Sequence, residues 1–300
     1  MTSRIVVGYT ATRSGADAVA LGGRLAAATG SRIELVLVLP WEERSVITPA
    51  SPGYERHLHD QAKQWLTDAA SAIPEGVDHH EHVRFGESIA AGLTAAAEQL
   101  KAALIVVGAA EGGQRGRHRL GSTAAELLHS ATVPVALAPK GTAEDAAAGV
   151  ARITVATGAR PGSTDLLGAA VDLASATGAA VRLVSLVAVD LPSRVDTGVI
   201  RVAGAAHAAD VLAEIREALP ASIPADVLVA QGEGIDDAVR DLSWQAGEIA
   251  MVGSSRLARK HRLFLGATAA KILRVVPVPL IVVPRKPRAS APRFASRDPK

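Results

Sequence analysis

The sequence predicts an α/β protein built from two tandem, doubly wound domains, each with a five-stranded parallel sheet. Three observations lead to this prediction. The chain repeats itself at a nearly constant offset, its short apolar runs are rich in Val, Ile and Leu, and helical segments separate those runs. Short continuous apolar runs are typical of strands that are buried on both faces of a parallel sheet. Their alternation with helices is the pattern of a doubly wound fold.

The repeat is visible in matching segments that keep their order along the chain. LAAATG at 25–30 returns as LASATG at 173–178, which is an offset of 148. Later the offset becomes 145, and Val133-Pro134-Val135 falls over Val278-Pro279-Leu280. A tandem duplication explains both offsets. We therefore predict domains at residues 1–140 and 151–284, joined by a small and polar linker.

The first unit contains short apolar runs that predict buried strands at 4–8, 33–39, 103–107 and 133–138. Residues 77–85 alternate in polarity, which suits an edge strand. Helical patterns lie near 14–29, 54–72, 88–101 and 122–130. Gly30 is placed to end the first helix, and Ser88 and Ser122 are placed as N-caps of the third and fourth. The second unit repeats the pattern, with strands near 152–156, 181–188, 225–230, 249–252 and 278–283.

Composition narrows the class of protein. The chain has 300 residues and no cysteine, which excludes disulfides and thiolate metal sites and fits a reducing cytoplasm. No apolar run reaches the length of a membrane span, and the N-terminus lacks a secretion signal, so we expect a soluble cytoplasmic protein. Residues 285–300 carry six Lys/Arg and one Asp. We expect a disordered, solvated basic tail. A nucleic-acid-binding arm is the less favoured alternative, because aromatic residues beyond Phe294 are missing.

The loop between residues 108 and 122 is the candidate ligand site. Gly108 ends a predicted strand and Gly121-Ser122 begins a predicted helix, at the sheet edge where doubly wound folds bind ligands. Glycines allow close approach, and a helix N-terminus offers N–H groups to a phosphate. Ser122 acting only as a helix cap is the alternative interpretation. Both units carry basic residues in this loop: Arg115, Arg117, His118 and Arg119 in the first, and Arg256, Arg259, Lys260, His261 and Arg262 in the second.

Catalytic and metal motifs are weak. His80 and His82 share one face of a predicted strand, but the sequence shows no third ligand in a convincing frame, so we expect no metal site. We find neither a G-x-S-x-G elbow nor an H-E-x-x-H motif. Asp165, Asp236 and Asp237 lie near predicted helix starts, where carboxylates favour the helix dipole. We therefore expect no catalytic residue and, at most, a slow ATPase.

A strand ending in Val-Val-Gly, a glycine-rich loop, Gly-Ser opening a helix and a following Val-Pro-Val strand resemble the universal stress protein family. The tandem arrangement resembles its two-domain bacterial members, and the resemblance covers all but the linker and the tail. It implies an adenine-nucleotide alpha-hydrolase-like fold and a role as a stress-response regulator. It also implies ATP or another adenine nucleotide as ligand in one branch of the family. A scaffold with the same fold and degenerate sites, which binds no nucleotide, is the alternative.

The resemblance assigns the binding positions. In the first domain they are Val38, Gly108, Gly112, Gly121 and Ser122, and in the second they are Gly253 and Gly266. Thr10 replaces the aspartate of the binding branch and Glu111 replaces its middle glycine. The second domain has Gly158, Arg256 and Ala267 at the aspartate, middle-glycine and Ser/Thr positions. We therefore expect weak binding in the first domain and none in the second.

The family also pairs terminal strands, so the two repeats should form an intramolecular pseudo-dimer through strands that contain Pro134 and Pro279. These prolines suit edge strands, which lack a full ladder. Homodimers and further protein partners are compatible with this arrangement.

Overall fold

The computed structural model describes residues 3–40, 52–110, 112, 114–145, 149–157, 164–188, 198–255 and 263–285. The first repeat contains β1 (Arg4–Gly8), α1 (Arg13–Thr29), β2 (Arg32–Pro40), α2 (Pro52–Ala70), β3 (His79–Gly86), α3 (Ile89–Leu100), β4 (Leu104–Gly108), α4 (Ser122–Ser130) and β5 (Val135–Ala138). A short 3-10 helix, Thr142–Glu144, follows. The second repeat contains β6 (Arg152–Ala156), α5 (Thr164–Thr177), β7 (Ala180–Ala188), α6 (Gly198–Glu217), β8 (Ala225–Gly232), α7 (Ile235–Arg240), β9 (Glu248–Gly253), α8 (Ala267–Val275) and β10 (Leu280–Val283).

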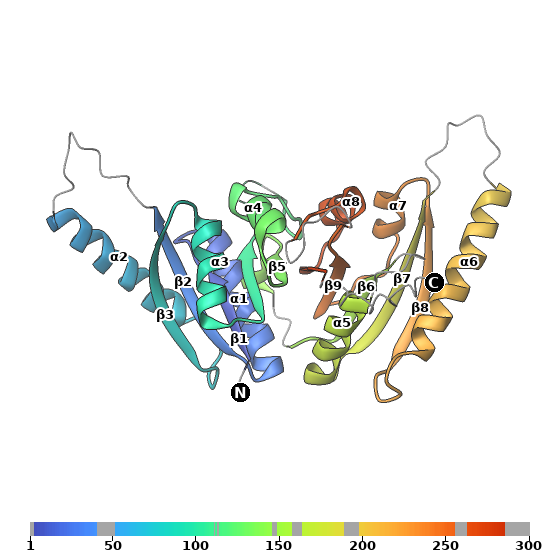
Figure 1. The fold of residues 1–300 in the computed structure, drawn as a ribbon, viewed down its shortest axis with the longest axis horizontal. Coiled ribbons are helices and arrows are strands. Elements are labelled where there is room, and N and C mark those ends of the chain that lie inside the picture. The colour runs from blue at the N-terminus through green and yellow to red at the C-terminus, as the bar shows by residue number, and fades with distance from the viewer. Residues whose placement is uncertain are drawn as a thin grey trace, which may run out of the picture.

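One continuous ten-stranded sheet runs through both repeats in the order β3-β2-β1-β4-β5-β10-β9-β6-β7-β8 (Figure 1). Strands are parallel within each repeat, which confirms the predicted doubly wound topology. β3 and β8 form the two edges of the sheet, as the alternating polarity of residues 77–85 predicted for β3.

The repeats meet where β5 pairs with β10, and this pairing is antiparallel. Leu137 lies opposite Leu280, and Val135 lies opposite Val282. Pro134 and Pro279 precede these strands instead of lying within them. Their carbonyls accept hydrogen bonds from the N–H groups of Ile105 and Ala250. Because each proline lies before the first residue of its strand, its missing N–H removes no hydrogen bond from the strand itself. The predicted pairing of the two repeats is thus present in the structure.

Two apolar layers cover the sheet. One core joins α1, α2, α5 and α6 to one face, and the other joins α3, α4, α7 and α8 to the opposite face. Neighbouring residues of a strand alternate between the layers, so that Val7 belongs to the first core and Val6 to the second. Almost all of these buried side chains are aliphatic, which agrees with an aromatic content of only 3%.

The helix ends test the cap predictions. Gly30 has a left-handed backbone (φ 64°) at the end of α1, and the Ser88 hydroxyl accepts a hydrogen bond from the Ala91 N–H at 3.0 Å. Both predictions are confirmed. The prediction for Ser122 is wrong, because Gly121 is the N-cap of α4 and Ser122 is its first helical residue.

The predicted basic tail at 285–300 lies outside the described residues, apart from Arg285. In the described part of the chain, no helix combines the length and the apolar character needed to cross a bilayer.

Candidate functional site

The carboxyl ends of β1 and β4 lie beside the first turn of α1. Gly108 is the last residue of β4, and a Cβ placed on it would lie 2.0 Å from the carbonyl oxygen of Ser14. Any larger residue would therefore push α1 away from the sheet. The structure gives Gly108 a packing role that is independent of any ligand.

The loop that follows β4 folds back on itself. The Ala110 N–H donates to the Arg119 carbonyl at 2.8 Å and closes the base of the loop. Gly112 lies at an exposed position with φ 80°, a left-handed backbone that glycine adopts readily. The Arg119 guanidinium is close by, because its Nη1 lies 2.7 Å from where a Cβ on Gly112 would sit. Gly112 thus forms a left-handed turn in this loop, whereas Glu111 and Gly113 lie outside the described residues.

The N-terminus of α4 faces this loop. Gly121 is its cap (φ −88°, ψ 173°) and forms no side-chain cap hydrogen bond. A Cβ on Gly121 would lie 3.2 Å from the Cβ of Ala110, so the helix start lies directly beside the loop. Ser122 is exposed. The helix therefore presents its first-turn N–H groups without a side-chain cap, together with a neighbouring hydroxyl.

Thr10 follows β1 and Val38 lies near the end of β2, at the positions that the resemblance assigns to nucleoside contact. The Thr10 hydroxyl lies 3.0 Å from the hydroxyl of Thr12, which caps α1 through the Gly15 N–H. Val38 lies two positions beyond Val36, the last β2 residue in register with β1. Its side chain is buried against α3, where a Cβ on Gly92 would lie 2.6 Å from Val38 Cγ1. Hence Val38 can face a ligand with its backbone only.

The basic residues of the first loop point to different partners and do not converge on one place. Arg115 forms an ion pair with Glu144 at 2.9 Å and lies 3.9 Å from Asp145, both in the segment after β5. Only Arg119 stays at the glycine turn described above.

Arg117 and His118 reach across to the second repeat. Arg117 Nη1 donates to the Val275 carbonyl at 2.5 Å, and His118 Nε2 donates to the Val278 carbonyl at 2.8 Å. Val275 is the last residue of α8, and Val278 lies in the connection from α8 to β10. These residues therefore hold the two repeats together.

His118 is neutral in this position. Its ring is buried, and its Nδ1 has no hydrogen-bond partner among the described residues. Burial lowers the pKa of His118 to about 4, and the hydrogen bond to the Val278 carbonyl opposes this shift. Because that carbonyl can only accept, the proton resides on Nε2.

The two ends of the corresponding loop in the second repeat are arranged as in the first, with different side chains. Gly266 caps α8, and a Cβ on it would lie 3.1 Å from the Cβ of Ser255. The Ser255 N–H donates to the Phe264 carbonyl, as Ala110 does to Arg119 in the first repeat. Ala267 follows the cap, so the hydroxyl of Ser122 has no counterpart.

Packing at the end of β9 differs from that at the end of β4. A Cβ on Gly253 would have its nearest contact at 3.8 Å, so Gly253 is not needed for packing as Gly108 is. Gly158 and residues 256–262, with all the basic residues of this loop, lie outside the described part of the chain.

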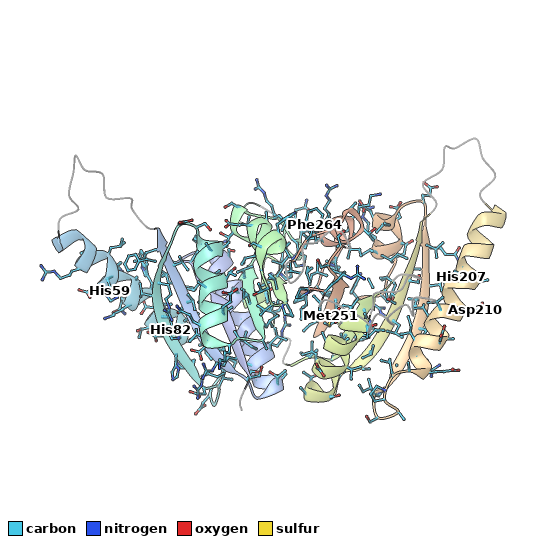
Figure 2. The ribbon with its side chains drawn as sticks, in the orientation of Figure 1. His59, His82, His207, Asp210, Met251 and Phe264 are labelled. Carbon is cyan, nitrogen blue, oxygen red and sulfur yellow. The ribbon has the colours of Figure 1, made fainter. Side chains whose placement is uncertain are left out.

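The second loop also crosses to the other repeat. The Leu263 N–H donates to the Ala131 carbonyl at 2.9 Å. The ring of Phe264, which is labelled in Figure 2, lies edge-on to the His129 ring, with centroids 5.1 Å apart. Each glycine-rich loop thus rests on the helix-to-strand connection of the opposite repeat. The sequence did not predict these contacts between the repeats, because residues that lie about 150 positions apart leave no local pattern.

Sequence reasoning also missed a partner for the two histidines of β3. Glu34 in β2 is in register with His80, and its carboxylate contacts both His80 and His82. The reason for expecting no metal site, the lack of a third ligand, therefore no longer holds. A glutamate within the apolar run RIELVLVL was the available signal.

Comparisons with known proteins agree with this architecture. The universal stress protein family model matches residues 1–139 and 149–284. Universal stress proteins of Mycobacterium bovis and Mycobacterium tuberculosis are each 29% identical over 296 residues, covering 93% of this chain and 99% of the relative.

Solved structures share the fold. A universal stress protein of Archaeoglobus fulgidus superposes with a TM-score of 0.64 at 17% identity, covering 94% of this chain and 96% of that chain. A Pseudomonas aeruginosa protein of unknown function superposes with a TM-score of 0.61 at 15% identity, covering 95% and 93%. On the match of the family model to both repeats, the chain belongs to the universal stress protein family.

Proposed function

We propose that this chain is a stress-response regulator whose first repeat binds an adenine nucleotide weakly and whose second repeat binds none. The observation that carries the proposal is the N-terminus of α4. It has a glycine cap without a side-chain hydrogen bond, and an exposed serine hydroxyl follows the cap. A helix start of this kind favours a phosphate through its N–H groups and its dipole.

The phosphate end of the ligand would lie between this helix start and the glycine turn. Gly112 supplies the left-handed turn, and Arg119 places positive charge beside it. Arg115, Arg117 and His118 are engaged elsewhere. The site therefore has one nearby cation instead of the four that the sequence suggested, and this favours modest affinity.

The nucleoside end would use the backbone of Val38 and the hydroxyl of Thr10. In the family's binding branch an aspartate stands where this chain has Thr10. A hydrogen bond to a charged group contributes about 1.5–3 kcal/mol. Replacing that aspartate with threonine therefore weakens binding by about one to two decades. The second repeat lacks both the aspartate and the hydroxyl, since Gly158 and Ala267 take their places.

Isothermal titration of the full chain with ATP, ADP and AMP, with and without magnesium, tests the proposal. We expect at most one site per chain. Gly121→Val should abolish binding, because its side chain would fill the space between the helix start and Ala110. The matched control is Gly266→Val, which makes the same change in the second repeat and should leave binding intact.

Two further variants test the assignment residue by residue. Thr10→Asp should tighten binding by at least about tenfold, because it restores the charge-assisted hydrogen bond. Ser122→Ala copies the second repeat and should weaken binding severalfold. Two tight sites, or full binding by Gly121→Val, would refute the proposal. No binding at millimolar nucleotide would favour the alternative, an interaction scaffold that uses the same fold.

A further inference from the structure

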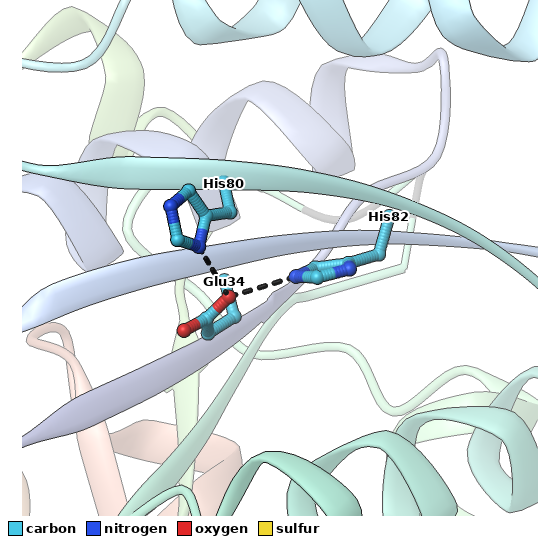
Figure 3. Close-up of side chains that lie close together, drawn as sticks. All are labelled: Glu34, His80 and His82. Carbon is cyan, nitrogen blue, oxygen red and sulfur yellow. Dashed lines mark hydrogen bonds and ion pairs between the residues drawn. The ribbon is translucent and has the colours of Figure 1, made fainter.

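A cluster of three potential metal ligands lies at the opposite end of the sheet from the glycine loops. It consists of Glu34 from β2 and His80 and His82 from β3 (Figure 3). The parallel pairing of β2 with β3 places Glu34 opposite His80 and Val36 opposite His82, so the three side chains emerge on the same face. The nearby Arg4 Nη1 donates to the Leu100 carbonyl, which places the cluster beside the C-terminus of α3.

Both histidines converge on a single carboxylate oxygen. His82 Nε2 lies 2.7 Å and His80 Nδ1 lies 3.6 Å from Glu34 Oε2 (Figure 3). Glu34 is 1% exposed, whereas His82 is 21% and His80 is 55% exposed. The cluster is therefore anchored by a buried anion and open to solvent on its histidine side, which gives an ion a path of entry.

The donor set suits a borderline transition-metal ion. Two imidazole nitrogens and one carboxylate oxygen are a ligand combination used for zinc, with a fourth position left for water. Zinc–ligand bonds of about 2.0–2.2 Å in a tetrahedron place the ligand atoms about 3.4 Å apart. The three potential ligand atoms already lie within 4.8 Å of one another. Small rotations about the side-chain bonds would open the short contact to His82 and bring the imidazoles together.

The charge balance also favours a cation. Glu34 is a buried carboxylate, and the one arginine that pairs with it among the described residues, Arg4, lies 3.6 Å from Oε1 through its Nε, which is longer than a hydrogen bond. A buried anion that is incompletely compensated attracts a cation more strongly than an exposed one, because water screens it less. Arg4 lies on the Oε1 side, so an ion at Oε2 would displace only the contact with His82, whose imidazole is itself one of the proposed ligands.

We propose that Glu34, His80 and His82 form a site for a divalent transition-metal ion of the zinc type in the first repeat. The second repeat has no such site, because its equivalent positions are Arg182, Asp226 and Leu228. The chain would thus bind one ion. This site is separate from the proposed nucleotide site, so its occupation requires no nucleotide.

Titration of the full chain with Zn²⁺ alone near neutral pH tests the proposal. We expect one equivalent bound per chain, with proton release and a rise in the melting temperature that grows with free Zn²⁺. Co²⁺ should give the visible d–d absorption of a tetrahedral site, and Zn²⁺ should displace it. His80→Gln and His82→Gln should each weaken zinc binding by more than about tenfold. Even the loss of a residue that only hydrogen-bonds to a metal ligand weakens binding by about 10–100-fold.

His79→Gln is the matched control. His79 lies on the same strand with its side chain on the other face, so this variant should bind like the unmodified chain. His80 is more than half exposed, and its replacement should leave the fold intact, as circular dichroism will verify. The absence of binding at millimolar Zn²⁺, or unchanged affinity in both His80→Gln and His82→Gln, would overturn the proposal and leave a hydrogen-bonded cluster without a ligand.

Discussion

The two repeats place opposite charges at the same buried position. Glu34 in β2 and Arg182 in β7 are related by the repeat offset of 148, and both are almost fully buried. Glu34 turns toward the histidines of the edge strand β3. Arg182 instead forms an ion pair with Glu248 of β9, toward the centre of the sheet, at 2.7 Å. A duplicated backbone has therefore kept a buried charge while changing its sign.

The charged groups of Arg182 and Glu248 find several partners within the chain. Arg182 donates to Thr154 and Glu248, and Arg152 donates to the other oxygen of Glu248 at 2.7 Å. The Thr154 hydroxyl also donates to Glu248, and the Arg182 guanidinium lies 5.2 Å from the ring centroid of Trp244. Burial lowers the pKa of Arg182, and its pairing with Glu248 opposes that shift.

The difference separates a structural network from a candidate binding site. Around Glu248 every partner is supplied by the protein and little is exposed to water. Around Glu34 the partners are the exposed His80 and the partly buried His82, whose imidazoles can turn toward an ion. A closed network stabilises the fold, whereas an open one leaves room for a ligand.

The largest effect is expected from Glu248→Leu. Removing one partner of a buried ion pair leaves an unpaired buried charge and costs about 3–5 kcal/mol. The matched variant Glu34→Leu should cost less, because the exposed His80 and Arg4 regain water. Urea denaturation followed by circular dichroism measures both variants. If both variants lost the same free energy of unfolding, the two networks would contribute equally to stability, and the proposed difference between them would be wrong.

A second contrast concerns the loops that cross between repeats. His118 of the first loop corresponds to Leu263 of the second at the offset of 145. The pKa of His118 is about 4 when folded, against 6.5 for a free histidine, so only the unfolded chain takes up this proton between those values. Stability should therefore fall as the pH drops from 6.5 to 4, by about 3 kcal/mol in total.

His118→Leu, which copies the second repeat, should remove this pH dependence. The variant loses the hydrogen bond to the Val278 carbonyl, which costs about 1 kcal/mol at neutral pH. Urea midpoints measured at a series of pH values for both chains isolate the contribution of His118 from that of the other histidines. An identical pH slope in the two chains would contradict the assignment.

The smallest effect concerns helices α3 and α7. The first has 12 residues and a Ser88 cap, and the second has 6 residues and a Gly234 cap without a side-chain hydrogen bond. Ser88→Ala should cost about 1 kcal/mol, whereas Gly234→Ser should stabilise by a few tenths. A Cβ on Gly234 meets no atom closer than 3.7 Å, so serine fits there. Thermal melts of both variants measure these changes. A lower melting temperature in Gly234→Ser would show that a serine at this position cannot cap α7 as Ser88 caps α3.

Local patterns in the sequence predicted the fold well. The strands in the interior of the sheet lie where the apolar runs indicated, because a strand buried on both faces needs apolar residues at every position. The edge strand β3 lies where the alternating polarity indicated. Gly30 and Ser88 were recognisable because capping depends on only a few neighbouring residues. The assignment of Ser122 failed by one position, since the adjacent glycine can also adopt the extended conformation of a cap.

The sequence by itself determined the two repeats, their parallel sheets and the glycine-rich loop, because each of these follows from local periodicity or from self-similarity. Only the tertiary structure decided that Arg117 and His118 bind the opposite repeat and that Glu34 meets His80 and His82. These contacts join residues far apart in the chain, and strand pairing and the antiparallel junction of β5 with β10 bring them together. A side chain's charge can be read from its letter, but the partner that compensates it depends on the packing.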